Sequence, residues 1–419
     1  MQERVAMNGF SITELVFELR MPYAKFGVGA LYEIGYDFSK LKLKKVLIVT
    51  DDYISKKTDY VERAVSSFKQ NGITADVWDG VEPEPSDTSI QEGIEFAKKG
   101  GYDGFVAIGG GSSIDTAKLI DLCTTYPAEL SDYFAPPIGK GLPIPGPIKF
   151  LVAVPTTSGT GSETTGTAVV TFVAKKSKFG VTHEYLIPKM AILDPLLTVS
   201  MPPKLTASTG VDALMHAIEA YLAKPYNTRE RPQSPSTRPA YQGSMPMTDF
   251  LAEKAILLIG EHLPKAYANG LNIEARTNMH LAAFIAGVAF GNAGVHLAHA
   301  LALPLSTVAM EKGVKLPHGV AAGVFGPGML KVLEPFYPEK CSIIANYLSG
   351  GSIPCAHEAL SELIKTLGLP SGLHELGITE NDIDALVDAA LMNKRLLSIS
   401  PITPERDVLK KIALESLRY

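Results

Sequence analysis

The sequence contains few cysteines and no long hydrophobic run. Its three cysteines, Cys123, Cys341 and Cys355, are too few and too scattered for a disulfide framework or a zinc ribbon. A reducing, cytoplasmic setting is therefore expected. No stretch of about 18 uncharged apolar residues occurs, so we expect no membrane-spanning helix. Residues 1–20 carry several charges and no continuous apolar run, so we also expect no secretory signal peptide.

The sequence also lacks an excess of positive charge. It has 39 lysines and arginines against 44 aspartates and glutamates, for a net charge of −5. This balance gives no basic surface for nucleic acid and no polybasic patch for a membrane. The 46% of hydrophobic residues is ordinary for a globular chain and is enough for a large core. At 419 residues the chain is longer than one typical domain, so two domains are expected.

Short apolar strands alternate with helical stretches in the first half of the chain. Helices are expected at about 60–71 and 87–99. The alternation predicts βαβ units and a parallel sheet. A small antiparallel pair is expected from 169–173 and 178–181. The strands expected before this pair are Glu14–Arg20, Lys45–Thr50, Ala75–Trp78, Phe105–Ile108 and Phe150–Val154.

A glycine-rich turn follows the strand at Phe105–Ile108. The turn reads Gly109-Gly-Gly-Ser-Ser and leads into a helix that starts near Ser112. Glycines let the backbone approach a ligand closely, and the first N–H groups of the helix point toward it, so the turn predicts a phosphate-binding loop. It matches neither the Walker pattern nor G-x-G-x-x-G. The alternative is a plain strand-to-helix turn.

Two further segments favour a nucleotide site. Asp51 ends the strand at Lys45–Thr50, where an acidic side chain can accept hydrogen bonds from ribose hydroxyls and repel a 2′-phosphate, which favours NAD over NADP. The alternative is a solvated loop acid. The strand at Phe150–Val154 runs into Pro155-Thr-Thr-Ser-Gly-Thr-Gly-Ser-Glu163. Hydroxyls and glycines at the carboxyl end of a strand lie where open α/β sheets bind ligands.

The second half of the chain is helical almost throughout. We expect an α/β dinucleotide-binding domain over residues 1–203 and an all-helical metal-binding domain over residues 204–419, with a cleft between them as the place for a site. The exception to helix is the long loop Pro225–Pro246, which carries Arg229 and Arg231 and also Arg238. A loop this long inside a domain is expected to be functional or mobile.

One helical segment carries a pair of metal-ligand side chains. Asp212 and His216 are four positions apart in Gly210–Glu219, so a helix places both on one face. Two ligands rarely suffice, and His318 with either His296 or His299 would complete a site for a divalent metal. Spacing alone does not choose between His296 and His299. The alternative is that the aspartate and histidines are ordinary capping or core groups.

Several motifs in one order resemble the iron-containing (group III) alcohol dehydrogenases over nearly the whole chain. The resemblance implies their fold, a parallel-sheet domain followed by an all-helical domain, as in dehydroquinate synthase. It implies hydride transfer between a primary alcohol or hydroxy acid and a nicotinamide cofactor, and a homodimer. The matching motifs are Gly109–Lys118, Pro155–Glu163, Met201–Pro203, Gly210–His216 and Pro317–Gly319.

The resemblance also implies which residues form the sites. The metal, Fe2+ or else Zn2+ or Mn2+, is expected on four residues that are also the catalytic ones, with His299 chosen over His296: Asp212, His216, His299 and His318. The metal is expected to act as a Lewis acid on the alcohol oxygen. NAD, or alternatively NADP, is expected on Asp51, Gly109, Gly110, Gly111, Ser112, Asp115, Thr156, Thr157 and Lys178.

Two positions depart from the family pattern. Glu84 stands where many members have an asparagine, which puts the nucleotide contact of this loop in doubt. Leu303 stands where the diol-reducing branch has a second histidine, so a direct histidine contact to a diol-like substrate is not expected.

Within the family, the chain is most similar to the hydroxyacid–oxoacid transhydrogenases, which use 4-hydroxybutyrate and 2-oxoglutarate with bound NAD. The similarity lies in Ala135–Gly141, Thr237–Ser244 and Phe290–His299. Arginines of the loop Pro225–Pro246 would suit carboxylate substrates, unless they only solvate the loop. Two other interpretations are a glycerol dehydrogenase-like zinc enzyme and a non-catalytic nucleotide-binding protein with a decayed site.

Overall fold

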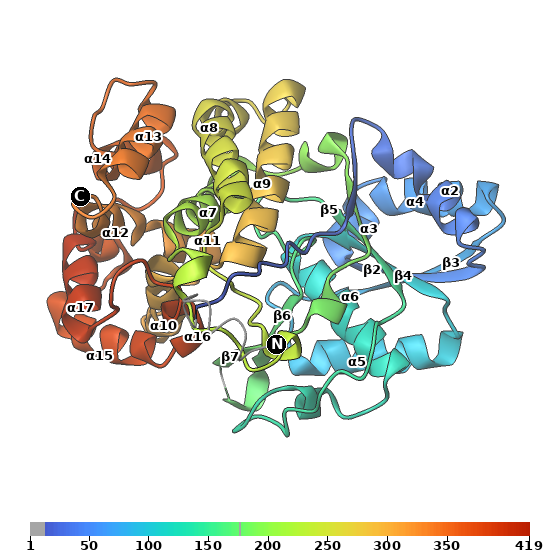
Figure 1. Cartoon of the computed structure of the whole chain (residues 1–419). Coiled ribbons are helices and arrows are strands. Elements are labelled where there is room, and N and C mark those ends of the chain that lie inside the picture. The colour runs from blue at the N-terminus through green and yellow to red at the C-terminus, as the bar shows by residue number, and fades with distance from the viewer. Residues whose placement is uncertain (1–12, 176) are drawn as a thin grey trace. The chain divides into compact units, whose positions relative to one another are not determined.

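The computed structural model describes residues 13–175 and 177–419 (Figure 1). Their contacts divide the chain into two compact units. The first, here called the sheet unit, comprises Met21–Ala213 and His262–Gly287. The second, here called the helical unit, comprises the described residues up to Arg20, then Leu214–Glu261 and Val288–Tyr419. Residues 1–12, which carry much of the argument against a signal peptide, lie outside the described residues.

The sheet unit is built on six parallel strands in the order β1-β8-β5-β4-β2-β3. The predicted parallel sheet is therefore confirmed, as is the small antiparallel pair of β6 and β7. The main strands are β1 (Tyr23–Phe26), β2 (Lys45–Asp51), β3 (Thr74–Val81), β4 (Gly104–Gly109), β5 (Phe150–Pro155) and β8 (Met190–Leu193), and the pair consists of β6 (Thr167–Phe172) and β7 (Ser177–Thr182).

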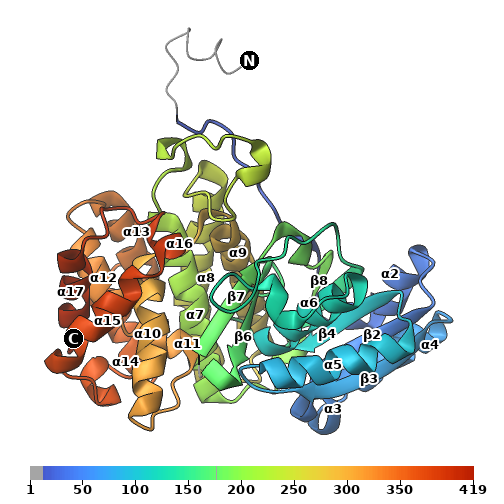
Figure 2. The same ribbon diagram turned by 90° about the horizontal axis from the view of Figure 1, so that it is seen from below.

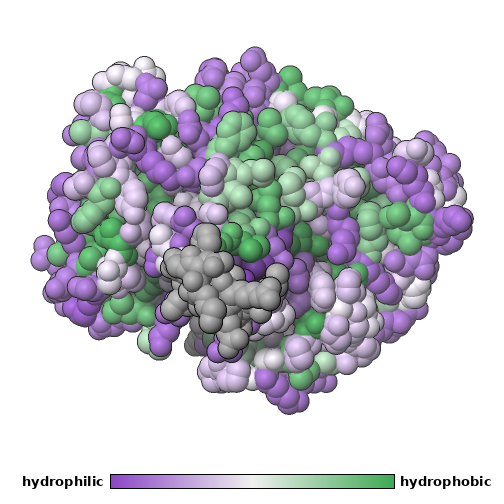
Figure 3. Space-filling model, viewed as in Figure 1, coloured by the Kyte–Doolittle hydropathy of each residue, from purple (hydrophilic) through white to green (hydrophobic). Residues whose placement is uncertain are grey.

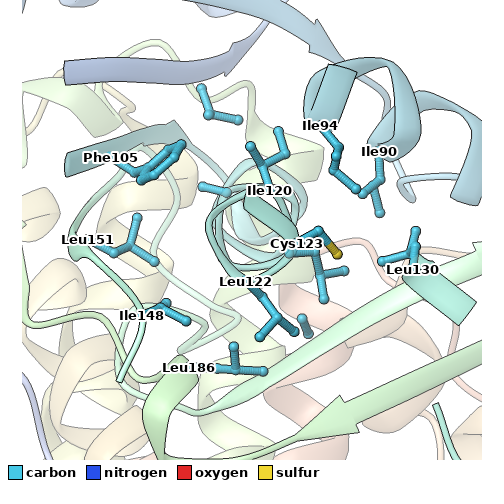
Figure 4. Close-up of a cluster of buried hydrophobic side chains, with 14 of the residues drawn as sticks. Ile90, Ile94, Phe105, Ile120, Leu122, Cys123, Leu130, Ile148, Leu151 and Leu186 are labelled. Carbon is cyan, nitrogen blue, oxygen red and sulfur yellow. The ribbon is translucent and has the colours of Figure 1, made fainter. Parts of the chain in front are cut away.

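Side chains alternate between two cores, one on each face of the sheet. Leu47 of β2 and Phe105 of β4 face the core made with α5 (Asp87–Gly100) and α6 (Gly111–Thr125), part of which Figure 4 shows. Their neighbours in the strands face the opposite core, which also contains α2 (Ile34–Lys40) and α4 (Tyr60–Gln70). Because both faces are covered by helices, the inner strands β2, β4, β5 and β8 are largely apolar, as in other parallel sheets.

The predicted strand at Glu14–Arg20 is wrong. This segment is not a strand of either sheet, and side chains form hydrogen bonds with its backbone instead. The amide side chain of Gln242 accepts from the N–H of Glu18 (3.0 Å) and donates to its carbonyl (2.8 Å). The amide of Asn292 binds the N–H and carbonyl of Arg20 in the same way, at 2.8 Å each. Two side-chain amides, and not a neighbouring strand, therefore bind the backbone at Glu18 and Arg20.

The rest of the chain after residue 202 is helical, as predicted, apart from the long loop Pro225–Pro246. The orange and red helices in Figure 2 belong to the helical unit. Residues 318–333 form two helices and not one, because Pro327 lies in the first turn of a new helix. The long helices are α7 (Pro203–Leu222), α8 (Pro246–Ala268), α9 (Ile273–Ala293), α10 (Leu297–Glu311), α13 (Pro338–Ser349), α14 (Ala356–Thr366), α15 (Glu380–Leu391) and α17 (Arg406–Glu415), and the short ones are α11 (His318–Gly323), α12 (Gly326–Leu333) and α16 (Lys394–Leu397).

Among the described residues, no single helix is long and apolar enough to cross a membrane. The helices α9 and α10 meet the length and composition criteria only as a pair, and that pair is bent by 100°. Apolar side chains nevertheless reach the surface, and in Figure 3 they gather over α8 and α9. Phe250 of α8 is 69% exposed.

The packing of α2 on the sheet predicts a strong effect of one substitution. Phe38 is fully buried and meets Phe68 and Phe150 edge to face, with ring centroids 5.1 and 5.2 Å apart. Phe38→Ala leaves a cavity, so we expect the free energy of unfolding to fall by about 3–5 kcal/mol in denaturant titrations. The control is Tyr36→Ala on the same helix, where the side chain is 56% exposed and little change is expected. A loss at Phe38 no larger than that of the control would contradict this packing.

Candidate metal and nucleotide sites

Helix α7 carries the first two candidate metal ligands. It begins at Pro203, a residue favoured in a first helical turn because its missing N–H has no partner to lose there. Asp212 and His216 lie one turn apart on this helix and are 2% and 4% exposed. The two compact units divide between Ala213 and Leu214, inside the helix, so Asp212 is held on the same continuous element as His216.

Two other helices bring their histidines to this face of α7. Asp212, His299 of α10 and His318 of α11 offer ligand atoms that all lie within 4.8 Å of one another. His216 is not part of this group of ligand atoms, but its ring lies beside the group, with its centroid 4.8 Å from that of His299 in a stacked arrangement. The His318 ring lies 5.4 Å from the His299 ring. The donor set of one carboxylate and three imidazoles fits a divalent transition metal such as iron, zinc or manganese.

An aromatic side chain fixes the plane of His216. The Phe290 ring stacks on the imidazole, with centroids 3.9 Å apart and planes 12° apart. His216 thus lies between Phe290 and His299. His318 is exposed, whereas Asp212 and His299 are buried. The group therefore has an apolar, packed side and a side that a small molecule can reach.

A buried glutamate orients His299. Glu219, on the same helix as Asp212, is fully buried, and its carboxylate accepts a hydrogen bond from Nδ1 of His299. It also accepts from the backbone N–H groups of His296 (2.9 Å) and Ala298 (3.0 Å) at the start of α10. Because Nδ1 is engaged, Nε2 is the nitrogen of His299 left to face a metal. Such carboxylate–histidine pairs fix the tautomer of a ligand and raise its basicity.

These contacts keep the carboxylate of Glu219 charged. Burial by itself raises the pKa of a carboxyl group. Here the charge and hydrogen bond of His299, followed by the contacts with His296, outweigh burial and lower the pKa of Glu219 to about 2.

His296 has a different part in the structure. It is the residue before α10, and its Nδ1 accepts a hydrogen bond from the N–H of Leu297 (2.8 Å). Burial lowers the pKa of His296, against the opposing effect of Glu219. Of the two histidines that the sequence left open, His299 is the one in the group with Asp212 and His318.

In the sheet unit, the glycine turn after β4 packs against the threonine loop after β5. Gly109 has φ +155°, a conformation that favours glycine, and a Cβ there would lie 2.2 Å from Oγ of Ser113. A Cβ on Gly111 would lie 2.8 Å from Oγ1 of Thr160, and one on Gly110 would lie 3.5 Å from Thr157. The two loops can meet because Gly110 and Gly111 have no side chain. The first N–H groups of α6 therefore lie beside the threonine side chains of the second loop.

Other residues expected to bind the nucleotide lie around this turn. Asp51 ends β2, and its Oδ1 accepts from the N–H of Ile54 (3.0 Å) as the cap of α3 (Asp52–Lys57). Its Oδ2 lies 3.4 Å from the Cβ position of Gly109. The N–H of Thr156 donates to the carbonyl of Gly109 (3.0 Å), which continues the β4–β5 pairing. Thr157 lies beside Gly110, as described above.

The carboxylate of Asp115 is bound by residues of the sheet unit. Its carboxylate accepts hydrogen bonds from the hydroxyl of Ser162, from Nζ of the fully buried Lys118 (3.3 Å) and from the N–H of Val169 (3.0 Å). Asp115 therefore ties α6 to the threonine loop and to β6. This is a structural task that the sequence did not reveal.

Glu84, at the position that departs from the family pattern, lies next to the glycine turn. Its N–H donates to Oγ of Ser112 (3.3 Å), and its carboxylate pairs with Nζ of Lys178 (2.8 Å). Its φ of +59° is rare for a residue other than glycine. Two expected nucleotide-binding residues, Ser112 and Lys178, are thus joined through Glu84.

The three arginines of the long loop differ in their surroundings. Arg238 is paired with Glu14 (3.3 Å) and Glu18 (3.4 Å), so it holds the amino-terminal segment to the loop. Arg229 has buried Nε and Nη2 atoms without a hydrogen-bond partner in the described part of the chain, and burial lowers the pKa of its guanidinium. Arg231 is exposed. Arg231 and Arg229 are the two that a carboxylate substrate could engage.

Comparison with known proteins identifies the family. The model of iron-containing alcohol dehydrogenases matches residues 22–195, and the model of the C-terminal part of the same family matches residues 240–417. The chain is 38% identical to the mitochondrial hydroxyacid-oxoacid transhydrogenase of Bos taurus, over 93% of this chain and 87% of that protein. The chain belongs to the iron-containing alcohol dehydrogenase family. It is an oxidoreductase that transfers a hydride between an alcohol or hydroxy acid and a nicotinamide cofactor.

Other relatives and solved structures agree with this family. The human mitochondrial hydroxyacid-oxoacid transhydrogenase is 37% identical over 97% of this chain and 91% of its own length. A structure of 1,3-propanediol oxidoreductase superposes with a TM-score of 0.83 at 32% identity, covering 96% of this chain and all of that one. Sulfoacetaldehyde reductase from Bifidobacterium kashiwanohense, solved with NAD+, gives 0.83 at 28% identity, over 96% of this chain and 98% of its own. The predicted fold of the family is confirmed, and membership implies a divalent metal and NAD.

The role of Glu219 is the main feature that sequence analysis missed. It lies three residues after His216, on the next turn of the same helix, so the pattern Asp212, His216, Glu219 was visible. What the sequence could not show is that α10 begins opposite this carboxylate. The pairing depends on a contact between residues 80 positions apart.

This pairing predicts an effect on metal binding. In Glu219→Gln the side chain keeps its volume but loses its charge and one of its two acceptor oxygens, so His299 loses the carboxylate that raises its basicity. We expect the affinity for Fe2+ or Zn2+ to fall by about 10–100-fold in equilibrium competition with a chelator. The matched control is Glu253→Gln, whose carboxylate contacts the hydroxyls of Tyr221 and Tyr347. Equal affinities in wild type and Glu219→Gln would show that the glutamate does not orient a ligand.

Proposed function

We propose that the protein is a hydroxyacid–oxoacid transhydrogenase, which moves a hydride from 4-hydroxybutyrate to 2-oxoglutarate through a bound nicotinamide nucleotide. The observation that carries the proposal is 37–38% identity to proteins of that name over 93–97% of the chain. The exposed guanidinium of Arg231 and the partly buried one of Arg229 offer charge for substrate carboxylates. The second candidate is an ordinary alcohol dehydrogenase, favoured by the similarity to 1,3-propanediol oxidoreductase.

Four residues are proposed to hold the metal, with iron as the first choice: Asp212, His216, His299 and His318. When bound, a divalent metal supplies Lewis acidity toward the oxygen of an alcohol or carbonyl group. The convergence of Asp212, His299 and His318 supports this assignment. Glu219 acts through His299, since it fixes the imidazole with Nε2 directed away from the carboxylate. Phe290 excludes water from one face of His216.

The nucleotide is proposed to bind at the carboxyl ends of β2, β4 and β5. The residues that contact it are Asp51, Gly109, Gly110, Gly111, Ser112, Asp115, Thr156, Thr157 and Lys178. The glycine turn binds the phosphates with backbone N–H groups, and Asp51 binds a ribose. When bound, the nicotinamide would accept a hydride from the carbinol carbon while the hydroxyl proton goes to solvent, and would pass the hydride to the keto carbon of 2-oxoglutarate, whose oxygen takes up a proton. The chain contributes orientation of the two partners and exclusion of water.

Domain roles, assembly and location complete the proposal. Residues 1–203 are proposed to bind the dinucleotide and residues 204–419 the metal. A homodimer is proposed because the outer strand β1 and its surroundings present apolar side chains, with Tyr23 81% exposed and Val28 61% exposed. A cytoplasmic location is proposed, although the named relatives are mitochondrial. Light scattering on the purified protein and fractionation of cells test these two points.

The transhydrogenase proposal predicts turnover without added nucleotide. Metal-loaded protein is mixed with 4-hydroxybutyrate and 2-oxoglutarate, and 2-hydroxyglutarate is measured with and without free NAD. We expect the same rate in both, because the bound nucleotide is reduced and oxidised in each cycle. Turnover that requires added nucleotide and is faster with simple alcohols would favour the ordinary alcohol dehydrogenase instead. Asp212→Ala is expected to lose activity in both assays, and His374→Ala, at an exposed histidine, to keep it.

The proposed role of Asp51 predicts a change in nucleotide preference. Asp51→Asn keeps a good helix cap for α3 but removes the charge that repels a 2′-phosphate. We expect the ratio of the affinity of the nucleotide-free protein for NAD to its affinity for NADP, both measured by titration, to fall by about tenfold, the equivalent of about 1.4 kcal/mol. Asp52→Asn is the control, because Asp52 is the next residue in the chain and its carboxylate is exposed and pairs with Lys56. An unchanged ratio in Asp51→Asn would remove this residue from the ribose site.

A further inference from the structure

A second group of metal-ligand side chains lies in the helical unit. Glu334, Cys355 and His357 offer ligand atoms that all lie within 4.8 Å of one another. Glu334 ends α12, Cys355 precedes α14, and His357 is in the first turn of α14. These residues belong neither to the group around Asp212 nor to the nucleotide loops. The three side chains supply oxygen, sulfur and nitrogen, the ligand types found together in zinc sites.

The positions of Glu334 and His357 are already close to those of two ligands of one ion. Oε2 of Glu334 lies 3.0 Å from Nδ1 of His357, and Oε1 accepts from the N–H of Ala356 at 3.3 Å. Ligands at 2.0–2.3 Å in a tetrahedral site have donor atoms roughly 3.3–3.7 Å apart. An ion would therefore need only small side-chain movements. Capping of α14 by Glu334 explains the contact with Ala356, but it does not explain a thiol and an imidazole at the same place.

An ion can reach this group from solvent. The side chains of Glu334 and His357 are 27% and 24% exposed, and Cys355 is partly exposed. His357 also lines a surface cavity of about 380 Å³ together with Glu358 and Ser361. Because the three side chains are partly exposed, solvent can supply a water molecule as a further ligand.

We propose that Glu334, Cys355 and His357 form a second metal site that binds a thiophilic divalent cation such as Zn2+, with water as the fourth ligand. As the metal–sulfur bond forms, the thiol proton passes to solvent. The ion would join the end of α12 to the start of α14 and so close the segment that contains α13. This site is independent of the proposed catalytic group, which contains no sulfur.

The four residues proposed to hold the catalytic metal contain no sulfur, so a metal–thiolate signal can report only on the second site. The metal-free full-length protein is titrated with Co2+, and thiolate-to-cobalt charge-transfer absorption is followed in the near ultraviolet. We expect the amplitude of this absorption to correspond to one thiolate-bound Co2+ per chain in wild type and to persist in Asp212→Ala. It is expected to be lost in Cys355→Ser. His357→Gln is expected to weaken Co2+ binding by at least about tenfold, since the loss of a ligand should cost no less than the loss of an outer partner.

Cys341→Ala is the matched control. This thiol is also free but is fully buried, so its variant is expected to keep the absorption. Addition of Zn2+ is expected to abolish the signal by displacing Co2+. The proposal is overturned if wild type shows no thiolate absorption after the Asp212 group has filled, or if Cys355→Ser retains it. Circular dichroism of each variant, compared with wild type, establishes that a lost signal does not come from unfolding.

Discussion

The buried carboxylate of Glu219 is the contact on which the candidate metal group depends. It accepts hydrogen bonds from the His299 imidazole and from two backbone N–H groups at the start of α10. A buried carboxylate without such donors would be costly, so α10 has to begin at this point. The same contact fixes both the position of the helix and the orientation of its histidine. Packing and ligand geometry therefore have one physical cause.

The nucleotide loops follow a comparable rule. Gly111 can approach Thr160 of the threonine loop only because it has no Cβ, which would collide with that side chain. A Cβ on Gly109 would collide with Ser113 of α6 in the same way. The approach leaves the first N–H groups of α6 beside hydroxyl groups at the carboxyl ends of parallel strands, where open α/β sheets bind ligands. At the start of α10 and at the start of α6, closely packed backbone segments provide N–H donors, and a neighbouring side chain fixes their arrangement.

Much of this arrangement could be predicted from the sequence because its signals are local. The strands are short apolar runs, and the glycine turn and the Asp212–His216 pair are contiguous motifs. Contacts between distant segments could not be predicted. The alternation in Glu14–Arg20 looks the same whether a strand or side-chain amides bind it, and nothing local tells that Arg238 is paired with Glu14. The roles of Glu219 and Glu84 depend likewise on partners far along the chain.

The most direct test of the account is crystallography of the iron-loaded protein with anomalous scattering at the iron absorption edge. The account predicts one strong peak within ligand distance of Asp212, His216, His299 and His318. It also predicts that Nε2 of His299 contacts the ion while Nδ1 stays on Glu219. The absence of a peak at these four residues, or an ion bound through Nδ1 of His299 with Glu219 turned away, would contradict the account.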